Sequence, residues 1–211
     1  VLYFTSLSIL FIQNYYFGYM MAIFLIFWFF VQTTWDFKNR IKTFLDFTIV
    51  SILSGVTSLI MILPTFLDLK THGEKLTSVD RLFTEKTWFL DIFAKNFIGS
   101  FDTTKYGSIP MIYVGIVPLL LAILFFTLKS IKFHVKLAYF ILITILVSSF
   151  YLQPLDLFWQ GMHAPNMFLH RYSWTFSIVI IFLAAESLER LKEFKLTNIL
   201  VSFSILGFGF I

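Results

Sequence analysis

Long apolar segments recur along the chain, and they limit its possible folds more than any other feature of the sequence. A bilayer core of about 30 Å needs about 20 apolar residues in an α-helix, or somewhat fewer in a short or partly buried span. We therefore predict an all-α, polytopic helical membrane protein with about six to seven transmembrane spans. The apolar segments are residues 1–12, 17–33, 44–63, 111–128, 137–152, 172–189 and 196–211.

Composition agrees with a membrane protein. Hydrophobic residues make up 58% of the chain and charged residues 13%, and the mean hydropathy is +0.84, all outside the usual values for a soluble domain. The absence of cysteine excludes disulfides and thiolate metal sites. A net charge of +4 is small, so the chain shows no nucleic-acid footprint.

The two ends of the chain lack the marks of a secretory leader or a polar terminus. The sequence starts at Val1 without a methionine, a basic n-region or a small-residue cleavage site, and it ends within the apolar run "ILGFGFI". We expect residues 1–211 to form a single transmembrane domain that is an internal part of a longer polytopic protein.

Basic residues in short loops predict the orientation of the spans, because cytoplasmic loops carry an excess of Lys and Arg. Three loops that fall on one side are basic, and we predict that loops 34–43, 129–136 and 190–195 are cytoplasmic. The turn at Gln13–Tyr16 and the loops 64–110 and 153–171 are then external. The basic residues of the three cytoplasmic loops are Lys38, Arg40, Lys42, Lys129, Lys132, Lys136, Arg190, Lys192 and Lys195.

The long external loop contains a stretch with helical periodicity, "LTSVDRLFTEKTWFLDIFAKNF". Thr77 and Asp80 have the spacing of a capping box, which predicts an amphipathic helix that starts there. Its apolar face suits either the outer membrane surface or neighbouring spans, and periodicity does not distinguish the two. The residues of that face are Val79, Leu82, Phe83, Leu90, Phe93 and Phe97.

Polar residues gather in the stretch "WQGMHAPNMFLHRYSW", Trp159–Trp174, between two apolar runs. Arg171 stands at the predicted start of a span, where a guanidinium can bind the phosphate of an anionic lipid in a bidentate manner. His170, His163 and Asn166 can add hydrogen bonds, and a histidine can act as an acid or base near neutral pH. The alternative is that Arg171 reaches lipid headgroups within an ordinary interfacial belt of aromatic residues.

A second candidate group, Asp102, Lys105 and Tyr106, lies in the connector "GSFDTTKYGSIP". The carboxylate of Asp102 can serve as a base, and Lys105 can bind phosphate. An aspartate in such a stretch is also an ordinary turn residue.

A third group is formed by Asn14, Tyr15, Tyr16 and Tyr19, which can hydrogen-bond to a sugar and stack on its ring. Tyrosines at a membrane boundary are also ordinary anchors.

Motifs of soluble enzymes are absent from the sequence, which contains no glycine-rich phosphate loop, HExxH or nucleophile elbow. No cofactor is evident, and the sequence does not decide whether a divalent metal takes part. His163 and His170 do not form a compact ligand pair, so we predict no metal site. The spans contain almost no charges apart from Glu186 and Glu189, which is atypical of an ion-coupled transporter.

Three strings, in this order, resemble the bacterial YfhO family of polytopic membrane proteins: "NYYFGYMMAIFLIFWF", "GSIPMIYVGIVPLLLAILFF" and "FWQGMHAPNMFLHRYSWTFSIVIIFLAAESLERL". The third, with its PN followed by RYSW and a span, is the most specific. The positions that match the first and third strings are Asn14, Tyr15, Tyr16, Gly18, Tyr19, Pro165, Asn166, Arg171, Tyr172 and Ser173. The resemblance implies binding or architectural roles for them.

The resemblance further implies a C-type glycosyltransferase in the plasma membrane of Gram-positive bacteria. Such an enzyme takes a hexosyl or N-acetylhexosaminyl group from a polyprenyl-phosphate carrier and transfers it to a cell-envelope polymer such as lipoteichoic acid. The catalytic carboxylate of that superfamily usually lies in the first external loop, which we expect to precede this chain, so Asp102 is a supporting candidate only. The alternatives are a flippase or transporter of lipid-linked sugar and a non-catalytic envelope-assembly protein.

Overall fold

The computed structural model describes residues 1–35, 40–72, 77–84, 91–96, 112–164 and 169–209, and the regular structure in these ranges is helical. The predicted all-α fold class is confirmed. Contacts divide the chain into two compact units. Unit 1 contains Val1–Ser78 and Trp159–His163, and unit 2 contains Val79–Phe158 and Ala164–Ile211.

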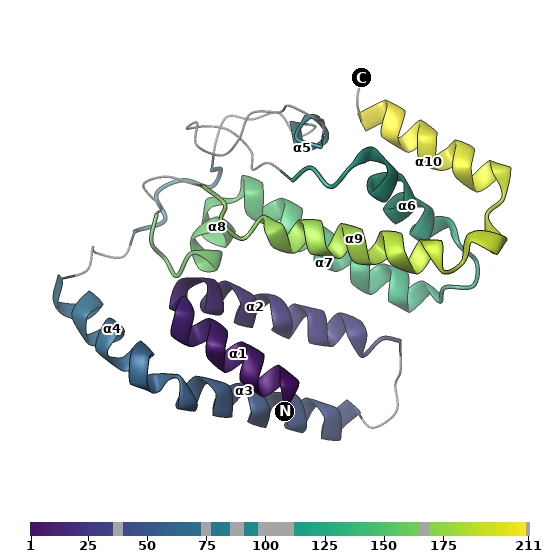
Figure 1. Ribbon diagram of the computed structural model, residues 1–211. Coiled ribbons are helices and arrows are strands. Elements are labelled where there is room, and N and C mark those ends of the chain that lie inside the picture. Colours follow the sequence, from purple (N-terminus) through teal and green to yellow (C-terminus); the bar gives the residue numbers. More distant parts are fainter. Residues whose placement is uncertain (36–39, 73–76, 85–90, 97–111, 165–168, 210–211) are drawn as a thin grey trace. The chain divides into compact units, whose positions relative to one another are not determined.

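Unit 1 is built from four helices, of which α1 lies between α2 and α3 (Figure 1). The predicted turn between the first two is a single residue, Asn14, which has an extended backbone and ends α1. Its side chain accepts a hydrogen bond of 3.1 Å from the backbone N–H of Phe17, so Asn14 is also the N-cap of α2. The helices are α1 (Leu2–Gln13), α2 (Tyr15–Gln32), α3 (Arg40–Thr57) and α4 (Leu59–His72).

The predicted span 44–63 requires one continuous helix. In the structure, α3 does not continue straight into α4. The axis bends by 65° at Ser58, and α4 then runs through Pro64 to His72. We predicted that the external loop begins at Pro64, and the structure shows that the helix continues through this residue. A proline removes one hydrogen bond from a helix without always ending it, and here the break in the helix occurs six residues earlier.

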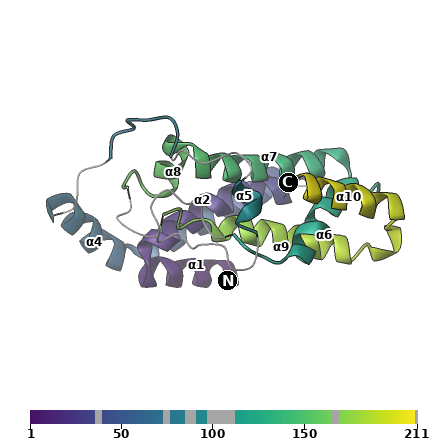
Figure 2. The same ribbon diagram turned by 90° about the horizontal axis from the view of Figure 1, so that it is seen from above.

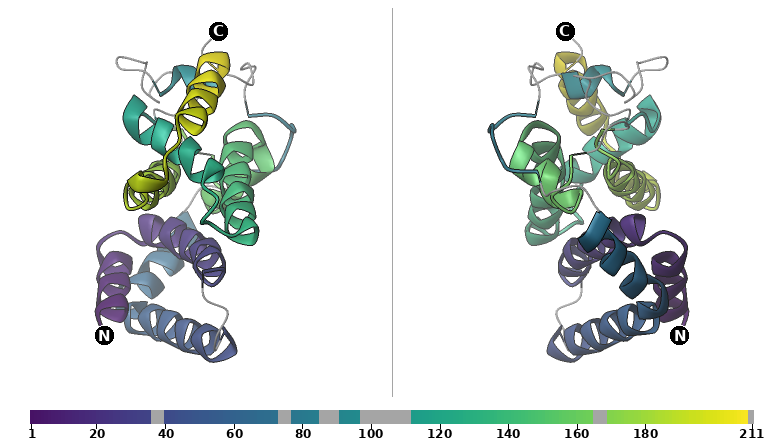
Figure 3. Two further views of the ribbon diagram at one scale, coloured as in Figure 1. Left: turned by 90° about the vertical axis from the view of Figure 1, so that its right-hand side faces the viewer. Right: turned by 90° about the vertical axis from the view of Figure 1, so that its left-hand side faces the viewer.

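Unit 2 packs its longer helices around an apolar core. Helix α6 packs chiefly against α9, α7 lies along α9, and α10 covers α6 (Figure 2). Figure 3 views α7 and α9 nearly along their axes. The elements are α5 (Asp91–Ala94), α6 (Ile116–Thr127), α7 (Phe133–Tyr151), α8 (Gln153–Trp159), α9 (Trp174–Leu188), the 3-10 turn η1 (Leu191–Glu193) and α10 (Leu196–Gly209).

The predicted amphipathic helix from Thr77 onward does not form in residues 77–84, which are extended or bent. Phe83 instead forms an antiparallel bridge with Leu152. On either side of it, the N–H of Thr84 donates to the carbonyl of Tyr151, and the N–H of Gln153 donates to the carbonyl of Leu82. The periodicity was misleading because these distant backbone partners satisfy the same N–H and C=O groups that a helix would use. Within 91–96, the short α5 is helical, while residues 85–90 and 97 lie outside the described residues.

All seven predicted apolar segments contain a helix. By length and composition, α2 and α7 are long and apolar enough to cross a membrane, and the bent pair α3–α4 qualifies if it is taken as one span. The remaining apolar helices α1, α6, α9 and α10 are shorter. A further helix, α8, occupies the start of the predicted external loop 153–171, where we had predicted no helix.

Candidate functional site

In unit 1, two tyrosines of the third predicted group lie close to the start of the stretch Trp159–Trp174. The hydroxyl of Tyr16 donates to Oε1 of Gln160 at 3.4 Å, and a β-carbon built on Gly161 would lie 3.9 Å from the ring of Tyr19. Gly161 and Met162 both have positive φ, 65° and 63°, as the central residues of a type I′ turn do. The tyrosines of α2 therefore lie beside the tight turn that follows Trp159.

A buried polar cluster lies in unit 2, where α7, α8 and the start of α9 meet. Nδ1 of His170 lies 2.8 Å from Oδ1 of Asp156, and the hydroxyl of Tyr172 lies 3.0 Å from the same oxygen. The single proton of that hydroxyl is shared between this oxygen and the backbone oxygen of Ser149, which lies 2.7 Å away. All three side chains are buried, with exposed fractions of 8% for residue Asp156, 3% for His170 and 0% for Tyr172. We call these three residues the Asp156 cluster.

Aromatic packing holds the cluster. The ring of Phe150 stacks on Tyr172, with centroids 5.7 Å apart and an interplanar angle of 17°. It meets the imidazole of His170 edge-on at 5.8 Å. Since apolar rings surround the polar atoms, little water reaches them, and their hydrogen bonds are stronger than at a surface.

The backbone of His170 is unusual, because its φ of 56° lies in the left-handed region. Histidine enters this region more readily than β-branched residues do, but the conformation still carries strain. The carbonyl of His170 accepts from the N–H of Ser173 at 2.9 Å and so forms the first turn before α9. Arg171, which is half-buried, sits inside this turn.

The cluster suits proton and anion chemistry. A carboxylate beside Nδ1 favours the imidazole tautomer whose proton is on Nδ1, which leaves Nε2 as the basic nitrogen. The neighbouring guanidinium of Arg171 brings a permanent positive charge to the same segment. The structure therefore combines an oriented imidazole with a cation within two adjacent residues.

The other predicted residues are distributed differently. His163 is half-buried in the turn of unit 1, whereas His170 and Arg171 belong to unit 2. Asn14 is explained by its capping role, and Tyr15 is exposed. Asn166, Asp102, Lys105 and Tyr106 lie outside the described residues, so their binding roles stay predictions.

Asp156 was missed by the sequence analysis, which considered Asp102 as the supporting carboxylate. The available signal is its local sequence "PLDLFW", in which one acid is surrounded by leucines and aromatic residues. A charge in such a setting needs a fixed partner. The partner His170 is 14 residues away, beyond the range of any local pattern.

Outside these regions, two polar contacts are explained by their partners. Glu186 pairs with Arg190 one helical turn later, at 2.7 Å. The exposed Asp80 accepts a hydrogen bond of 2.7 Å from Gln153, and this bond is the main reason that the pKa of Asp80 lies below its ordinary value. Within the described part of the chain, no group of three or more His, Asp or Glu residues could hold a metal ion.

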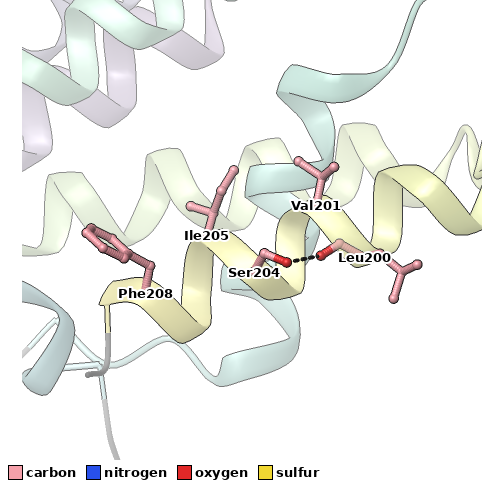
Figure 4. Close-up of a pocket in the computed structure, with 5 residues that line it drawn as sticks. All are labelled: Leu200, Val201, Ser204, Ile205 and Phe208. Carbon is pink, nitrogen blue, oxygen red and sulfur yellow. Dashed lines mark hydrogen bonds between the residues drawn. The ribbon is translucent and has the colours of Figure 1, made fainter.

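An open apolar hollow lies on one face of α10 (Figure 4). Its single polar side chain, Ser204, donates to the backbone oxygen of Leu200 in its own helix at 2.9 Å. The hollow therefore offers no group for chemistry. It is lined by Leu200, Val201, Ser204, Ile205 and Phe208.

Apolar helices, two of which in the described part of the chain are long enough to cross a bilayer, define a polytopic helical membrane protein. A family model described as bacterial membrane protein YfhO matches residues 1–211, and the chain belongs to this family. No curated protein and no solved structure matches the chain.

Proposed function

We propose that the protein carrying this chain is a membrane glycosyltransferase that takes a sugar from a polyprenyl-phosphate carrier. The acceptor is a cell-envelope polymer such as lipoteichoic acid, and the reaction takes place at the outer face of the bacterial plasma membrane. Membership of the YfhO family supports this class of activity. The observation that carries the proposal is the position of Arg171, whose cationic side chain belongs to a turn that the Asp156 cluster anchors on both sides.

In this proposal, the guanidinium of Arg171 binds the phosphate of the polyprenyl-phosphate donor. In the transfer, the bond between the sugar C1 and the phosphate oxygen breaks, and its electron pair stays on the leaving polyprenyl phosphate. The acceptor hydroxyl forms the new bond to C1 and gives up its proton to a base. A fixed guanidinium stabilises the charge that develops on the leaving phosphate, and it does so most effectively where water is excluded.

Unit 1, considered by itself, carries two tyrosines of a kind that can contact a sugar. Tyr16 and Tyr19 offer ring faces and hydroxyls, and both lie beside the segment that contains Gln160. Aromatic faces with a polar edge suit the alternating apolar and hydroxyl surfaces of a sugar ring.

The test is Arg171→Ala in the full-length protein, expressed in cells that lack the native copy. Sugar incorporation into the envelope polymer should fall by about 100-fold or more, the usual loss when one group that stabilises developing charge is removed. Arg81→Ala is the matched control, since it removes an arginine that is 63% exposed in the same unit, and it should retain activity. Normal incorporation by an Arg171→Ala protein that accumulates to the usual level would remove the basis of the proposal.

A flippase for lipid-linked sugar is the second candidate, and the 65° bend between α3 and α4 favours it. Interrupted helices in transporters open binding sites near the middle of the bilayer. Vesicles that contain the purified protein separate the two functions. A flippase moves labelled lipid-linked sugar between leaflets without consuming it, whereas a transferase consumes it only when the acceptor is present.

A further inference from the structure

Both chain neighbours of Arg171 are bound to the same carboxylate oxygen. Nδ1 of His170 lies 2.8 Å and the hydroxyl of Tyr172 3.0 Å from Oδ1 of Asp156. The hydroxyl of Tyr172 also reaches the backbone of Ser149 in α7. The main chain of Arg171 is therefore fixed on both sides by contacts with α7 and α8.

The strained backbone of His170 depends on the same contact. A non-glycine residue with φ of 56° persists only where its surroundings hold it there. For His170, these surroundings are the carboxylate of Asp156 and the edge-on ring of Phe150. Without the carboxylate, Nδ1 of the imidazole keeps only its longer contact of 3.4 Å with the hydroxyl of Tyr172, and the backbone that leads into Arg171 is held less firmly.

From these contacts we infer that Asp156 is a positioning residue for Arg171. By holding both neighbours, it places the guanidinium where the phosphate of the polyprenyl donor binds, and this role rests on the proposed function. Asp156 does not itself touch the phosphate. A displacement of about 1 Å in a group that orients a substrate can cost about 100-fold in rate.

Three substitutions separate the contributions of the carboxylate. Asp156→Leu keeps the number and branching of the side-chain heavy atoms and removes both acceptor oxygens, and it should raise the Kd for polyprenyl phosphate in nanodiscs by about tenfold or more. Asp156→Asn keeps an oxygen acceptor and should restore most of the affinity. Tyr172→Phe keeps the ring stacked on Phe150 and removes one of the two anchors, so its effect should lie between them.

A double-mutant cycle on the full-length protein decides whether Asp156 acts through Arg171. If it does, adding Asp156→Leu to Arg171→Ala weakens binding no further, because the group that it positions is gone. If the two substitutions weaken binding additively, the inference is overturned, since Asp156 would then have an effect independent of Arg171. Should Asp156→Leu fail to accumulate, the same cycle is run with Tyr172→Phe.

The cycle also separates this inference from the proposed function. Unchanged binding and transfer in Arg171→Ala reject the proposed role of Arg171, and the positioning role with it. Weak binding in Arg171→Ala together with normal binding in both Asp156→Leu and Tyr172→Phe rejects the positioning role alone. A rise in KM for the donor with a smaller change in kcat supports positioning.

Discussion

Two helix contacts, one in each compact unit, are held together by different chemistry. In unit 1, α1 and α3 meet along a row of small hydroxyl side chains, which we call the hydroxyl seam. Ser58 donates to the backbone oxygen of Ser8 at 3.1 Å, Ser54 reaches that of Phe4 at 3.3 Å, and Tyr3 bonds to Ser51 at 2.8 Å. In unit 2, mostly apolar side chains fill the space between α6, α7 and α9, apart from a bond of 2.8 Å from Ser187 in α9 to the backbone oxygen of Leu121 in α6, and the buried carboxylate lies in the Asp156 cluster.

The difference follows from what each polar group needs in an apolar setting. The hydroxyl of Ser54 lies 2.9 Å from the carbonyl oxygen of Val50, and that of Ser58 lies 2.7 Å from the carbonyl oxygen of Ser54. Both hydroxyls therefore have a hydrogen-bond acceptor even without α1. A carboxylate has no such local partner and needs donors from other segments. Neutral hydroxyls thus serve helix packing at low cost, whereas a buried carboxylate is expensive to keep and marks a site with a further role.

The largest expected effect comes from removing the carboxylate. Asp156→Ala should lower the free energy of unfolding by about 3–5 kcal/mol, the usual loss when one partner of a buried pair is removed. Denaturation of the purified protein in detergent, followed by tryptophan fluorescence, measures it. Asp80→Ala removes a carboxylate that is 65% exposed in the same unit and should have little effect. If both variants lose the same free energy of unfolding, the buried carboxylate of Asp156 contributes no more to stability than the exposed carboxylate of Asp80.

A smaller effect is expected in the apolar core of unit 2. Leu183 in α9 is fully buried, and Leu183→Ala should cost about 2 kcal/mol, near the lower end for such substitutions. The value is low because lipid solvates leucine well, which leaves chiefly the lost packing contacts. Ile181→Ala is the control on the same helix, where the side chain is 53% exposed, and it should be nearly neutral in the same denaturation.

The sequence was sufficient for features that depend on local information. Apolar runs predicted the helices because length and hydropathy are properties of contiguous residues, and a polar break predicted the turn at Asn14. Residues 77–84 were predicted wrongly because their backbone partners lie near residue 152.

The candidate site shows the same limit. Arg171 and His170 were identified from residue type and position, but Asp156 was not, since its role depends on a contact across 14 residues. The hydroxyl seam was also not predicted. Nothing in the order of serines along α3 indicates that they face residues 50 positions earlier in the chain.

Within the hydroxyl seam, a single substitution should have a small effect. Ser58→Ala removes one hydrogen bond between helices and should cost about 0.5–1 kcal/mol, as measured for such bonds in membranes. Ser204→Ala is the matched control, because that hydroxyl bonds only within α10 (Figure 4) and should be neutral. A loss from Ser58→Ala as large as that from Asp156→Ala would contradict the distinction between the two contacts.

The smallest effect is expected for the exposed carboxylate of Asp80, and it depends on pH. The hydrogen bond from Gln153 lowers the pKa of Asp80 from its ordinary value of 3.8, with a further contribution from Arg81. A lowered pKa in the folded state stabilises the protein above the unfolded value, and this stabilisation is lost as the pH falls through the folded pKa. Since solvent screens the group, the effect is far weaker than that of Asp156.

Comparison with Asp80→Asn isolates this contribution. The asparagine does not titrate, so the difference in unfolding free energy between the two proteins should be constant from about pH 6 to pH 5 and change below about pH 4, with the aspartate form losing stability. A difference that stays constant down to pH 3, or an aspartate form that gains stability in acid, would show that the bond from Gln153 does not bias the charge of Asp80.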